Sequence, residues 1–258
     1  MSTMSNWTVT EADSPVLIHV PHAATVIPPA VRDEIVLSDD ELVNELALMT
    51  DHHTDLIAES VAAMCPVNLF VNQLSRLVVD PERFPDEREV MRRVGMGAVY
   101  TKTSSGAPLR HGIGVDDTQL LESYFFPYAK AIEQQVDRVL ATHGRCIIID
   151  LHSFPQDPLP YELDQTALRP GVCLGSDHFH TPAWLSEVAE QSFGGIAEGV
   201  GWNTPFAGTY VPTKHYRRVP EVSSVMVELR RDLYLERGGS AGMTQVESFA
   251  QMIAAIVE

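Results

Sequence analysis

Basic residues are scarce in this chain. Its 258 residues include 18 Lys and Arg against 35 Asp and Glu, which gives a formal net charge of −17 with histidine neutral. Binding to nucleic acid depends on a surface of lysine and arginine that displaces counterions from the phosphates. The charge balance therefore argues against nucleic acid as a partner.

Long apolar runs are also lacking. No stretch approaches the roughly eighteen apolar residues of a membrane span, and residues 1–13 lack the basic start and apolar core of an export signal. Cysteine is rare, and Cys65, Cys146 and Cys173 are odd in number and widely spaced, which favours reduced thiols over a disulfide framework. We expect a cytoplasmic protein without a membrane partner.

No repeat of fixed period and no low-complexity tract interrupts the chain, so one domain over residues 1–258 is the simplest organisation. The hydrophobic share of 45% and the charged share of 21% are ordinary for a globular protein with a sizeable core. Four short apolar or alternating segments predict strands: 16–20, 67–71, 146–152 and 222–229. The segment 146–152 is apolar on both faces, as in a central strand.

Helical patterns lie between these strands. Ser38 and Glu41 have the spacing of a reciprocal helix cap. Apolar residues then recur at helical spacing in two stripes: Leu42, Val43, Leu46 and Met49, then Leu56, Ile57, Val61 and Met64. A longer stripe over 121–139 ends at Gly144, with Pro127 as an expected kink, and 244–257 predicts an amphipathic helix. Strand and helix alternate, so we predict an α/β fold.

Polar side chains stand at the carboxyl ends of three predicted strands: His22, Asp150 with His152, and Glu228. In an open α/β sheet these ends form the ligand crevice. Two imidazoles and a carboxylate hold a divalent metal with one position open, and a further carboxylate can accept a proton. Taken alone, His22 is more often a turn residue, and Glu228 would be a solvated or salt-bridged strand residue beside Arg230.

The segment around Asp51, His52, His53 and Asp55 resembles a metal cluster. Adjacent residues on a helix project in different directions, so at most one or two of them can bind one ion. On an unbroken helix with Leu42, Leu46 and Met49 as its core stripe, Asp51 would project away from the core. For Asp51, a helix cap or a solvated position is as good an explanation as a ligand.

Arginine binds carboxylates through its planar pair of donors. Arg76 and Arg83 lie in the irregular segment 73–108, and a long irregular segment in a compact domain is usually functional. They suggest a small acidic molecule as the substrate. Arg83, Arg88, Arg92 and Arg93 have the alternative role of neutralising acidic neighbours, which we favour for all of them except Arg83.

Three more polar residues are candidates for lining the same pocket. We assign Asn203 to substrate binding, although a local turn explains it equally well. His178 and His180 precede Thr181 and Pro182, where a helix cap is an equal explanation. The roles of these two histidines stay open.

Four motifs in sequence order resemble the N-formylglutamate amidohydrolase family. They are Pro21-His22 after a strand, Ser75-Arg76-Leu77-Val78-Val79-Asp80, Asp150-Leu151-His152-Ser153-Phe154-Pro155, and Val227-Glu228-Leu229-Arg230-Arg231-Asp232-Leu233-Tyr234. Each motif alone is weak, whereas the four in this order are specific. The resemblance covers residues 16–234, nearly the whole chain.

This resemblance implies a relative of the zinc carboxypeptidases and aminoacylases, with a three-layer α/β/α fold around a mixed sheet. It also implies zinc held by His22 and His152 together with an acidic residue in the Asp-x-x-x-Asp spacing of Asp51 and Asp55, and Glu228 as general base. We assign the third ligand to Asp51. The alternatives are Asp55, His52 and His53.

Other expectations concern the surroundings of the metal. Cobalt, iron or manganese suit such ligands as well as zinc does. Strand periodicity puts Asp150 on the same face as His152, where it would hold the imidazole in one tautomer. Arg76, supported by Arg83, would bind the carboxylates of the substrate.

The chain departs from the family pattern in three places. Ala23-Ala24 stands where the family usually has Ser-Gly, and Thr25 stands where the wider group has a ligand glutamate. Asp80-Pro81-Glu82-Arg83 keeps the arginine of the common Asp-x-Asn-Arg and loses the asparagine. These departures concern the third ligand and the substrate preference.

The activity implied by the resemblance is metal-dependent hydrolysis of N-formyl-L-glutamate to formate and L-glutamate, a step of histidine degradation. One alternative is a related deacylase of another N-acyl acidic amino acid. The other is a binder of an acidic metabolite that performs no turnover. The oligomeric state cannot be inferred from the sequence.

Overall fold

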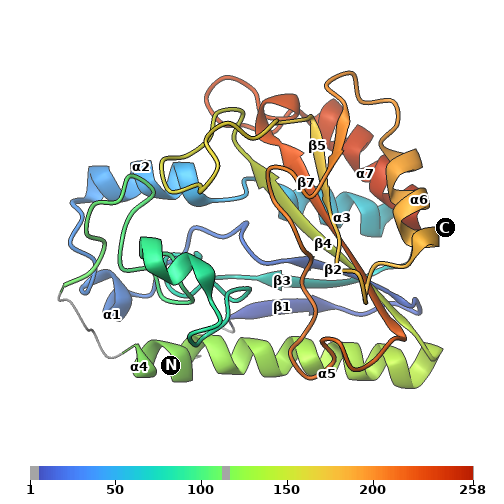
Figure 1. Cartoon of the computed structure of the whole chain (residues 1–258), viewed down its shortest axis with the longest axis horizontal. Helices are drawn as coiled ribbons and strands as arrows, with labels where there is room; N and C mark the ends of the chain where they lie inside the picture. The colour runs from blue at the N-terminus through green and yellow to red at the C-terminus, as the bar shows by residue number, and fades with distance from the viewer. Residues whose placement is uncertain (1–5, 112–116, 258) are drawn as a thin grey trace.

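A computed structural model describes residues 6–111 and 117–257, and a mixed sheet of seven strands runs through them (Figure 1). The strand order is β1-β3-β2-β4-β7-β5-β6. The central strands β3, β2, β4 and β7 are parallel, whereas β1 and β5 run antiparallel to β3 and β7. The strands are β1 Trp7–Thr10, β2 Val16–Val20, β3 Asn68–Asn72, β4 Cys146–Phe154, β5 Val172–Gly175, β6 Val200–Trp202 and β7 Val222–Arg230.

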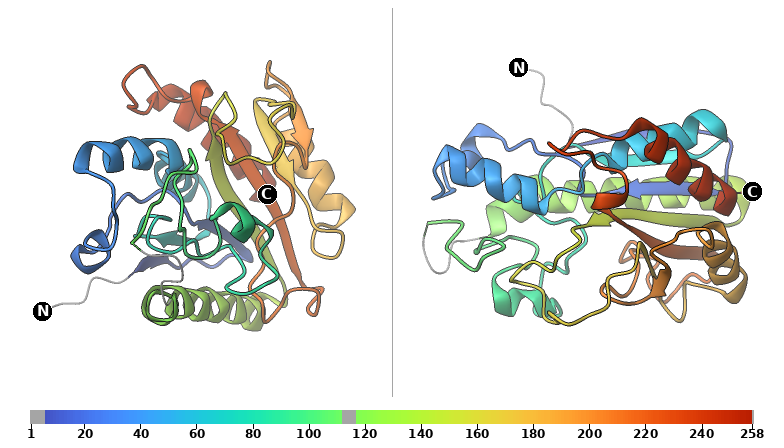
Figure 2. Two further views of the ribbon diagram at one scale, coloured as in Figure 1. Left: turned by 60° about the vertical axis from the view of Figure 1, so that its left-hand side comes forward. Right: turned by 90° about the horizontal axis from the view of Figure 1, so that it is seen from above.

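Helices cover both faces of this sheet. One apolar core joins the sheet to α3, α6 and α7, and a second joins its other face to α5, which lies below the strands in the left view of Figure 2. The predicted three-layer α/β/α architecture is therefore confirmed. The α-helices are α1 Pro29–Arg32, α2 Asp39–Met49, α3 Thr54–Met64, α4 Thr118–Leu120, α5 Phe126–His143, α6 Ala183–Ser192 and α7 Met243–Val257. None of them, within the described residues, has the length and apolar character needed to cross a bilayer.

The apolar run of β4 occupies the centre of the sheet. Ile147, Ile149 and Leu151 pack into the core shared with α3 and α7, while Cys146 and Ile148 pack into the core shared with α5. Burial on both faces explains why the run shows no alternation. The strand continues to Phe154, two residues beyond the predicted end, so that His152 lies within the strand.

The predicted unbroken helix after Ser38 is wrong. Its capping box is present, since Ser38 Oγ accepts from Glu41 N and Glu41 Oε2 accepts from Ser38 N, but α2 ends at Met49. Thr50 is extended, and His53 adopts the left-handed conformation before α3 begins. The break lets Asp51 N donate to the His22 carbonyl at 2.9 Å. Two residues of the predicted stripes, Val43 and Met64, are exposed.

The helix predicted around Pro127 is divided as well. A π-helical turn over Leu121–Phe125 separates α4 from α5, and Pro127 lies in the first turn of α5. Proline has no N–H to donate back along the helix, which explains why the regular pattern is interrupted here. Gly144 ends α5 with a φ of 71°, as predicted.

The irregular segment 73–108 lies beside α2 at the end of the sheet where the parallel strands finish (Figures 1 and 2). Leu42 and Met49 of α2 share an apolar cluster with Leu77, Met96 and Tyr100 of this segment. Packing against α2 gives the segment a fixed position beside β2 and β4, although its only described regular element is a 3-10 helix at Val90–Val94.

Candidate metal and catalytic site

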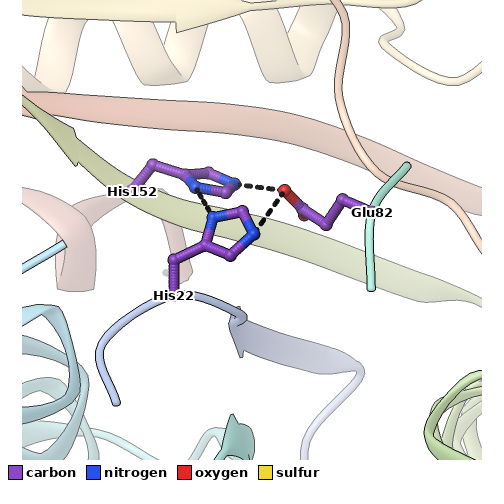
Figure 3. A group of neighbouring side chains, drawn as sticks. All are labelled: His22, Glu82 and His152. Atoms are coloured by element: carbon purple, nitrogen blue, oxygen red, sulfur yellow. Dashed lines mark hydrogen bonds and ion pairs between the residues drawn. The ribbon is translucent and has the colours of Figure 1, made fainter. Parts of the chain in front are cut away.

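Three neighbouring strands carry the predicted site residues. His22 follows β2 after Pro21, His152 lies in β4, and Glu228 is the register partner of His152 in β7. All three side chains are buried, and the rings of His22 and His152 have centroids 5.1 Å apart. Figure 3 shows the two imidazoles side by side.

The Nδ1 atoms of the two histidines and Oδ2 of Asp51 form a small triangle. Its sides are 3.2 Å between the two nitrogens, 3.1 Å from His152 to Asp51 and 3.6 Å from His22 to Asp51. Ligand atoms around a tetrahedral zinc with bonds of about 2.0–2.1 Å lie about 3.4 Å from one another. The three atoms thus have the mutual spacing of one face of such a site.

The far nitrogens of both rings face carboxylates. His22 Nε2 lies 2.9 Å from Asp80 Oδ1, and His152 Nε2 lies 3.2 Å from Glu82 Oε2 and 3.3 Å from Asp150 Oδ1. With a cation on the Nδ1 side of each ring, the hydrogen of a neutral imidazole would stand on Nε2, where these carboxylates can accept it. Three lone pairs then converge on one point, an arrangement that a cation stabilises.

The charges around the histidines favour a cation as well. Asp51 and Asp80 are paired with Arg231 and Arg76, whereas neither Glu82 nor Asp150 has an arginine partner among the described residues. Burial disfavours a charged His152, yet the negative charges of Glu82 and Asp150 outweigh it and hold the pKa of the imidazole well above 6.5. The residues present therefore fit a divalent metal ion in both geometry and charge.

Asp51 is fixed by contacts that its neighbours lack. Arg231 Nη2 donates to Asp51 Oδ1 at 3.0 Å, which leaves Oδ2 free to face the histidines. The pKa of Asp51 lies well below its usual value, because hydrogen bonds and charge from His152 and His22 outweigh burial. His52 and His53 instead pair with the carbonyls of Ala47 and Gly239, and Asp55 Oδ1 accepts from the Leu56 N–H.

A second grouping combines His22, His152 and Glu82, the residues drawn in Figure 3. In this grouping, Glu82 Oε2 lies 3.9 Å from His22 Nε2 and 3.2 Å from His152 Nε2. Using it would require His22 Nε2 to act as a ligand while Asp80 Oδ1 lies 2.9 Å away. The Nδ1 set with Asp51 avoids this conflict, so we take it as the candidate metal site.

Glu228 is the buried carboxyl group beside these ligands. Its exposed fraction is 8%, and its Oε2 has no hydrogen-bond partner among the described residues. Burial raises the pKa of Glu228 to about 7, against the opposing positive charges of His152 and Arg231. A carboxyl group that ionises near neutrality can take up and release a proton under ordinary conditions.

The two predicted substrate arginines differ in how they are engaged. Arg76 donates to Asp80 Oδ2 at 2.7 Å and to the Tyr100 hydroxyl at 3.0 Å. The guanidinium of Arg83 makes no hydrogen bond with a described residue and is held by longer ion pairs, 3.6 Å to Asp80 and 3.7 Å to Glu89. Arg83 therefore has the larger number of donors open to a ligand.

Two further arginines, Arg88 and Arg92, form ion pairs with acidic neighbours, as expected for arginines that neutralise nearby charge. Arg88 is paired with Asp86 at 2.7 Å and Arg92 with Glu87 at 3.0 Å. Both pairs lie within the segment 73–108 on its exposed side. They explain these two arginines without a ligand.

Asn203 and His180 are engaged in local contacts. Asn203 has a φ of 54°, and its Oδ1 accepts from the backbone N–H groups of Ser176 and Gly208. His180 Nδ1 pairs with the Val222 carbonyl at 2.6 Å, at the start of β7, whereas Glu228 lies near the end of that strand. His178 is exposed. The turn and cap explanations account for these positions.

Several residues that contact the site were not assigned from the sequence. Asp80 and Glu82 come from the irregular segment, and Arg231 directly follows β7. His19 is buried within β2, with Nδ1 3.0 Å from Asp150 Oδ1 and Nε2 2.7 Å from the Tyr128 hydroxyl. A histidine inside an otherwise apolar strand was the available signal for this contact, and it lies on the same strand that delivers His22.

Comparisons with known proteins show the family and the fold of the chain. A sequence model described as N-formylglutamate amidohydrolase matches residues 14–235. The N-formylglutamate deformylase of Pseudomonas putida is 27% identical over 234 residues, covering 86% of this chain and 82% of the relative, and that of Pseudomonas aeruginosa is 26% identical over 236 residues with the same coverage. The crystal structure of N-formylglutamate amidohydrolase from Ralstonia eutropha superposes with a TM-score of 0.78 at 20% identity, over 98% of this chain and 96% of the other, a likeness of fold.

Proposed function

The chain belongs to the N-formylglutamate amidohydrolase family, and from this membership we propose that it hydrolyses N-formyl-L-glutamate to formate and L-glutamate. The relatives named as N-formylglutamate deformylases support this substrate. The observation that carries the proposal is the triangle of His22 Nδ1, His152 Nδ1 and Asp51 Oδ2. A metal ion held by these three atoms would supply an electrophilic centre that promotes hydrolysis of an unactivated amide.

In this proposal His22, Asp51 and His152 hold a divalent metal ion, with zinc as the first choice for two nitrogens and one carboxylate oxygen. Bound there, the ion supplies Lewis-acid polarisation of the formyl oxygen and lowers the pKa of water. Asp80 faces Nε2 of His22, and Asp150 and Glu82 both face Nε2 of His152, so a carboxylate is available to accept the hydrogen on the far side of each ring. These contacts keep the Nδ1 lone pairs directed at the ion.

Glu228 acts as the general base of the proposed reaction. Its buried carboxylate takes a proton from the attacking water and delivers it to the amide nitrogen as the C–N bond breaks. The unpartnered Oε2 supports this role, because no described residue competes for it. The pKa of about 7 allows both the acceptance and the return of the proton near neutral pH.

Arg83 and Arg76 bind the two carboxylates of the substrate. The open donors of Arg83 support a direct ion pair, and Arg76 is held in place by Asp80 and Tyr100. Binding at the glutamate end would orient the formyl carbon toward the ion and Glu228. Asn203 would contribute indirectly, since its side chain joins Ser176 to Gly208.

A kinetic comparison of N-acyl amino acids tests the proposal. Formate release from N-formyl-L-glutamate is measured beside hydrolysis of N-acetyl-L-glutamate, N-succinyl-L-glutamate and N-formyl-L-aspartate. We expect the highest kcat/KM for N-formyl-L-glutamate. A preference for an acetyl or succinyl group would assign a different deacylase activity, and tight binding with no turnover would assign a binding protein. We place the reaction in the cytoplasm, in keeping with three cysteines that form no disulfide bond.

Metal dependence is tested separately. Purified protein is analysed for bound metal, dialysed against a strong chelator and assayed again after adding zinc, cobalt, manganese or ferrous iron. Loss of activity on chelation and recovery with one of these ions is the expected result. Full activity in protein free of stoichiometric metal would overturn the metal assignment.

A further inference from the structure

Glu82 is an acidic side chain set among three histidines. Its Oε2 lies 3.2 Å from His152 Nε2 and 3.9 Å from His22 Nε2, and its Oε1 lies 3.5 Å from His19 Nδ1. The exposed fraction of its side chain is 16%, and Oε1 is fully buried without a hydrogen-bond partner among the described residues. Burying a carboxylate costs free energy unless a hydrogen-bond donor or a positive charge lies beside it.

The neighbouring carboxylate of Asp150 is already supplied with donors. Asp150 Oδ2 accepts from the Tyr210 N–H at 3.0 Å, and Oδ1 accepts from His19 Nδ1 at 3.0 Å. The neutral ring of His19 then accepts the Tyr128 hydroxyl hydrogen on Nε2, at 2.7 Å. Each oxygen of Asp150 thus has a donor, and His152 Nε2, at 3.3 Å from Oδ1, would be a second donor to that oxygen.

His152 Nε2 itself is buried and has no hydrogen bond of good geometry among the described residues. Two acceptors lie within reach, and Glu82 Oε2 is the nearer one, at 3.2 Å against 3.3 Å for Asp150 Oδ1, which also accepts from His19 Nδ1. The two unsatisfied groups, the Nε2–H of His152 and the carboxylate of Glu82, are therefore complementary.

We propose that Glu82 is the positioning residue for His152: its carboxylate accepts the Nε2 hydrogen and thereby directs Nδ1 at the metal position. The inference rests on the proposed metal site. Asp80 has the equivalent relation to His22 Nε2, at 2.9 Å, so each ligand histidine is paired with one carboxylate of the segment 73–108. Glu82 does not bind substrate in this arrangement, because its oxygens face the rings.

Carboxylate and carboxamide differ at this position in one decisive respect. A carboxylate only accepts, so it enforces a hydrogen on Nε2, whereas an amide can turn its NH2 toward the ring and permit a hydrogen on Nδ1. A hydrogen on Nδ1 removes the lone pair that would bind the ion. Glu82→Gln therefore tests the tautomer with almost no change in side-chain volume.

The experiment compares zinc affinity in the full-length protein, Glu82→Gln and the control Glu87→Gln. Glu87 lies in the same segment, is exposed and is paired only with Arg92. Zinc Kd is measured by competition with a chromophoric chelator, and thermal melting of each variant checks folding. We expect Glu82→Gln to weaken zinc binding about 10- to 100-fold, as for other groups that orient metal-binding histidines, and Glu87→Gln to leave it unchanged.

Equal zinc affinity of folded Glu82→Gln and the unsubstituted protein would overturn the inference on Glu82 alone. An unsubstituted protein that binds no divalent metal would overturn the metal site of the proposed function. If Glu82→Gln does not fold, the unsubstituted protein can be used to test the same proposal by NMR. Long-range 15N–1H spectra of the zinc-loaded protein should show the His152 hydrogen on Nε2, and a hydrogen on Nδ1 would contradict the proposal.

Discussion

The Nδ1 atoms of His22 and His152 lie 3.2 Å apart although 130 residues separate them in the sequence. Two nitrogens that both present a lone pair repel each other at this distance, and a hydrogen or a metal ion between them removes the repulsion. Carboxylates behind both rings occupy the alternative hydrogen positions. Four predictions follow from this arrangement and from the groups around it.

Removing one ligand should remove both the metal and the activity. In His152→Ala the remaining atoms, His22 Nδ1 and Asp51 Oδ2, give only two donors for the ion. We expect substoichiometric zinc by elemental analysis and a loss of kcat/KM of at least about a hundredfold, because Lewis-acid stabilisation is worth several kcal/mol. Normal zinc content in folded His152→Ala would exclude this ligand. His178→Ala, at an exposed position, is the control.

Replacing the general base should separate chemistry from binding. Glu228→Gln keeps the shape of the side chain but cannot accept a proton, so kcat should fall about 10²- to 10⁴-fold. Zinc content and KM should change little, since Glu228 is not among the three ligand atoms. The check is steady-state kinetics together with metal analysis. A variant with unchanged kcat would show that another group takes the proton.

The pH dependence of kcat/KM should reflect the ionisation of the Glu228 carboxyl group. Burial raises the pKa of this carboxyl to about 7, and a bound cation would move it back toward the ordinary value. As pH falls through this pKa the base becomes protonated, so kcat/KM should decline on the acid side between about 7 and the ordinary glutamate value of about 4.3. Activity that stays constant below this window would contradict the assignment.

Arg83 should contribute through one carboxylate of the substrate. Loss of a charge-assisted hydrogen bond costs about 1.5–3 kcal/mol, so Arg83→Ala should raise KM for N-formyl-L-glutamate about 10- to 100-fold. N-formyl-L-glutamine, which lacks the side-chain carboxylate, shows which group is bound. If Arg83 binds that carboxylate, the substitution will scarcely affect this poorer substrate. Equal losses on both substrates would point to the α-carboxylate instead, and no loss on either would exclude Arg83.

The strand residues of the site could be predicted from the sequence because strand geometry is regular. A buried strand that ends at Pro21-His22, and the two-residue period that puts Asp150 and His152 on one face, define positions without tertiary information. Parallel pairing of β4 with β7 then brings His152 opposite Glu228. The alternation of strands and helices and the placing of these residues at strand ends therefore follow from local patterns, whereas the three layers were implied by the resemblance to a known family.

The third ligand could not be placed in this way. The chain leaves the helix after Met49 with no glycine or proline to mark the break, and the contact that accompanies it, Asp51 N to the His22 carbonyl, is a tertiary one. Asp80 and Glu82 present the same difficulty. They lie in a segment without periodicity, whose position depends on packing against α2.

Arg231 ties together parts of the site that come from distant segments. It donates to Asp51 Oδ1, to the Leu48 carbonyl and to Ser153 Oγ, and it stands three residues after Glu228. The carboxylate corner of the triangle, the end of α2 and the residue next to His152 are thus joined by a single guanidinium. A side chain that cannot make these bonds at position 231 would therefore release Asp51 from both α2 and β4, at one corner of the proposed metal site.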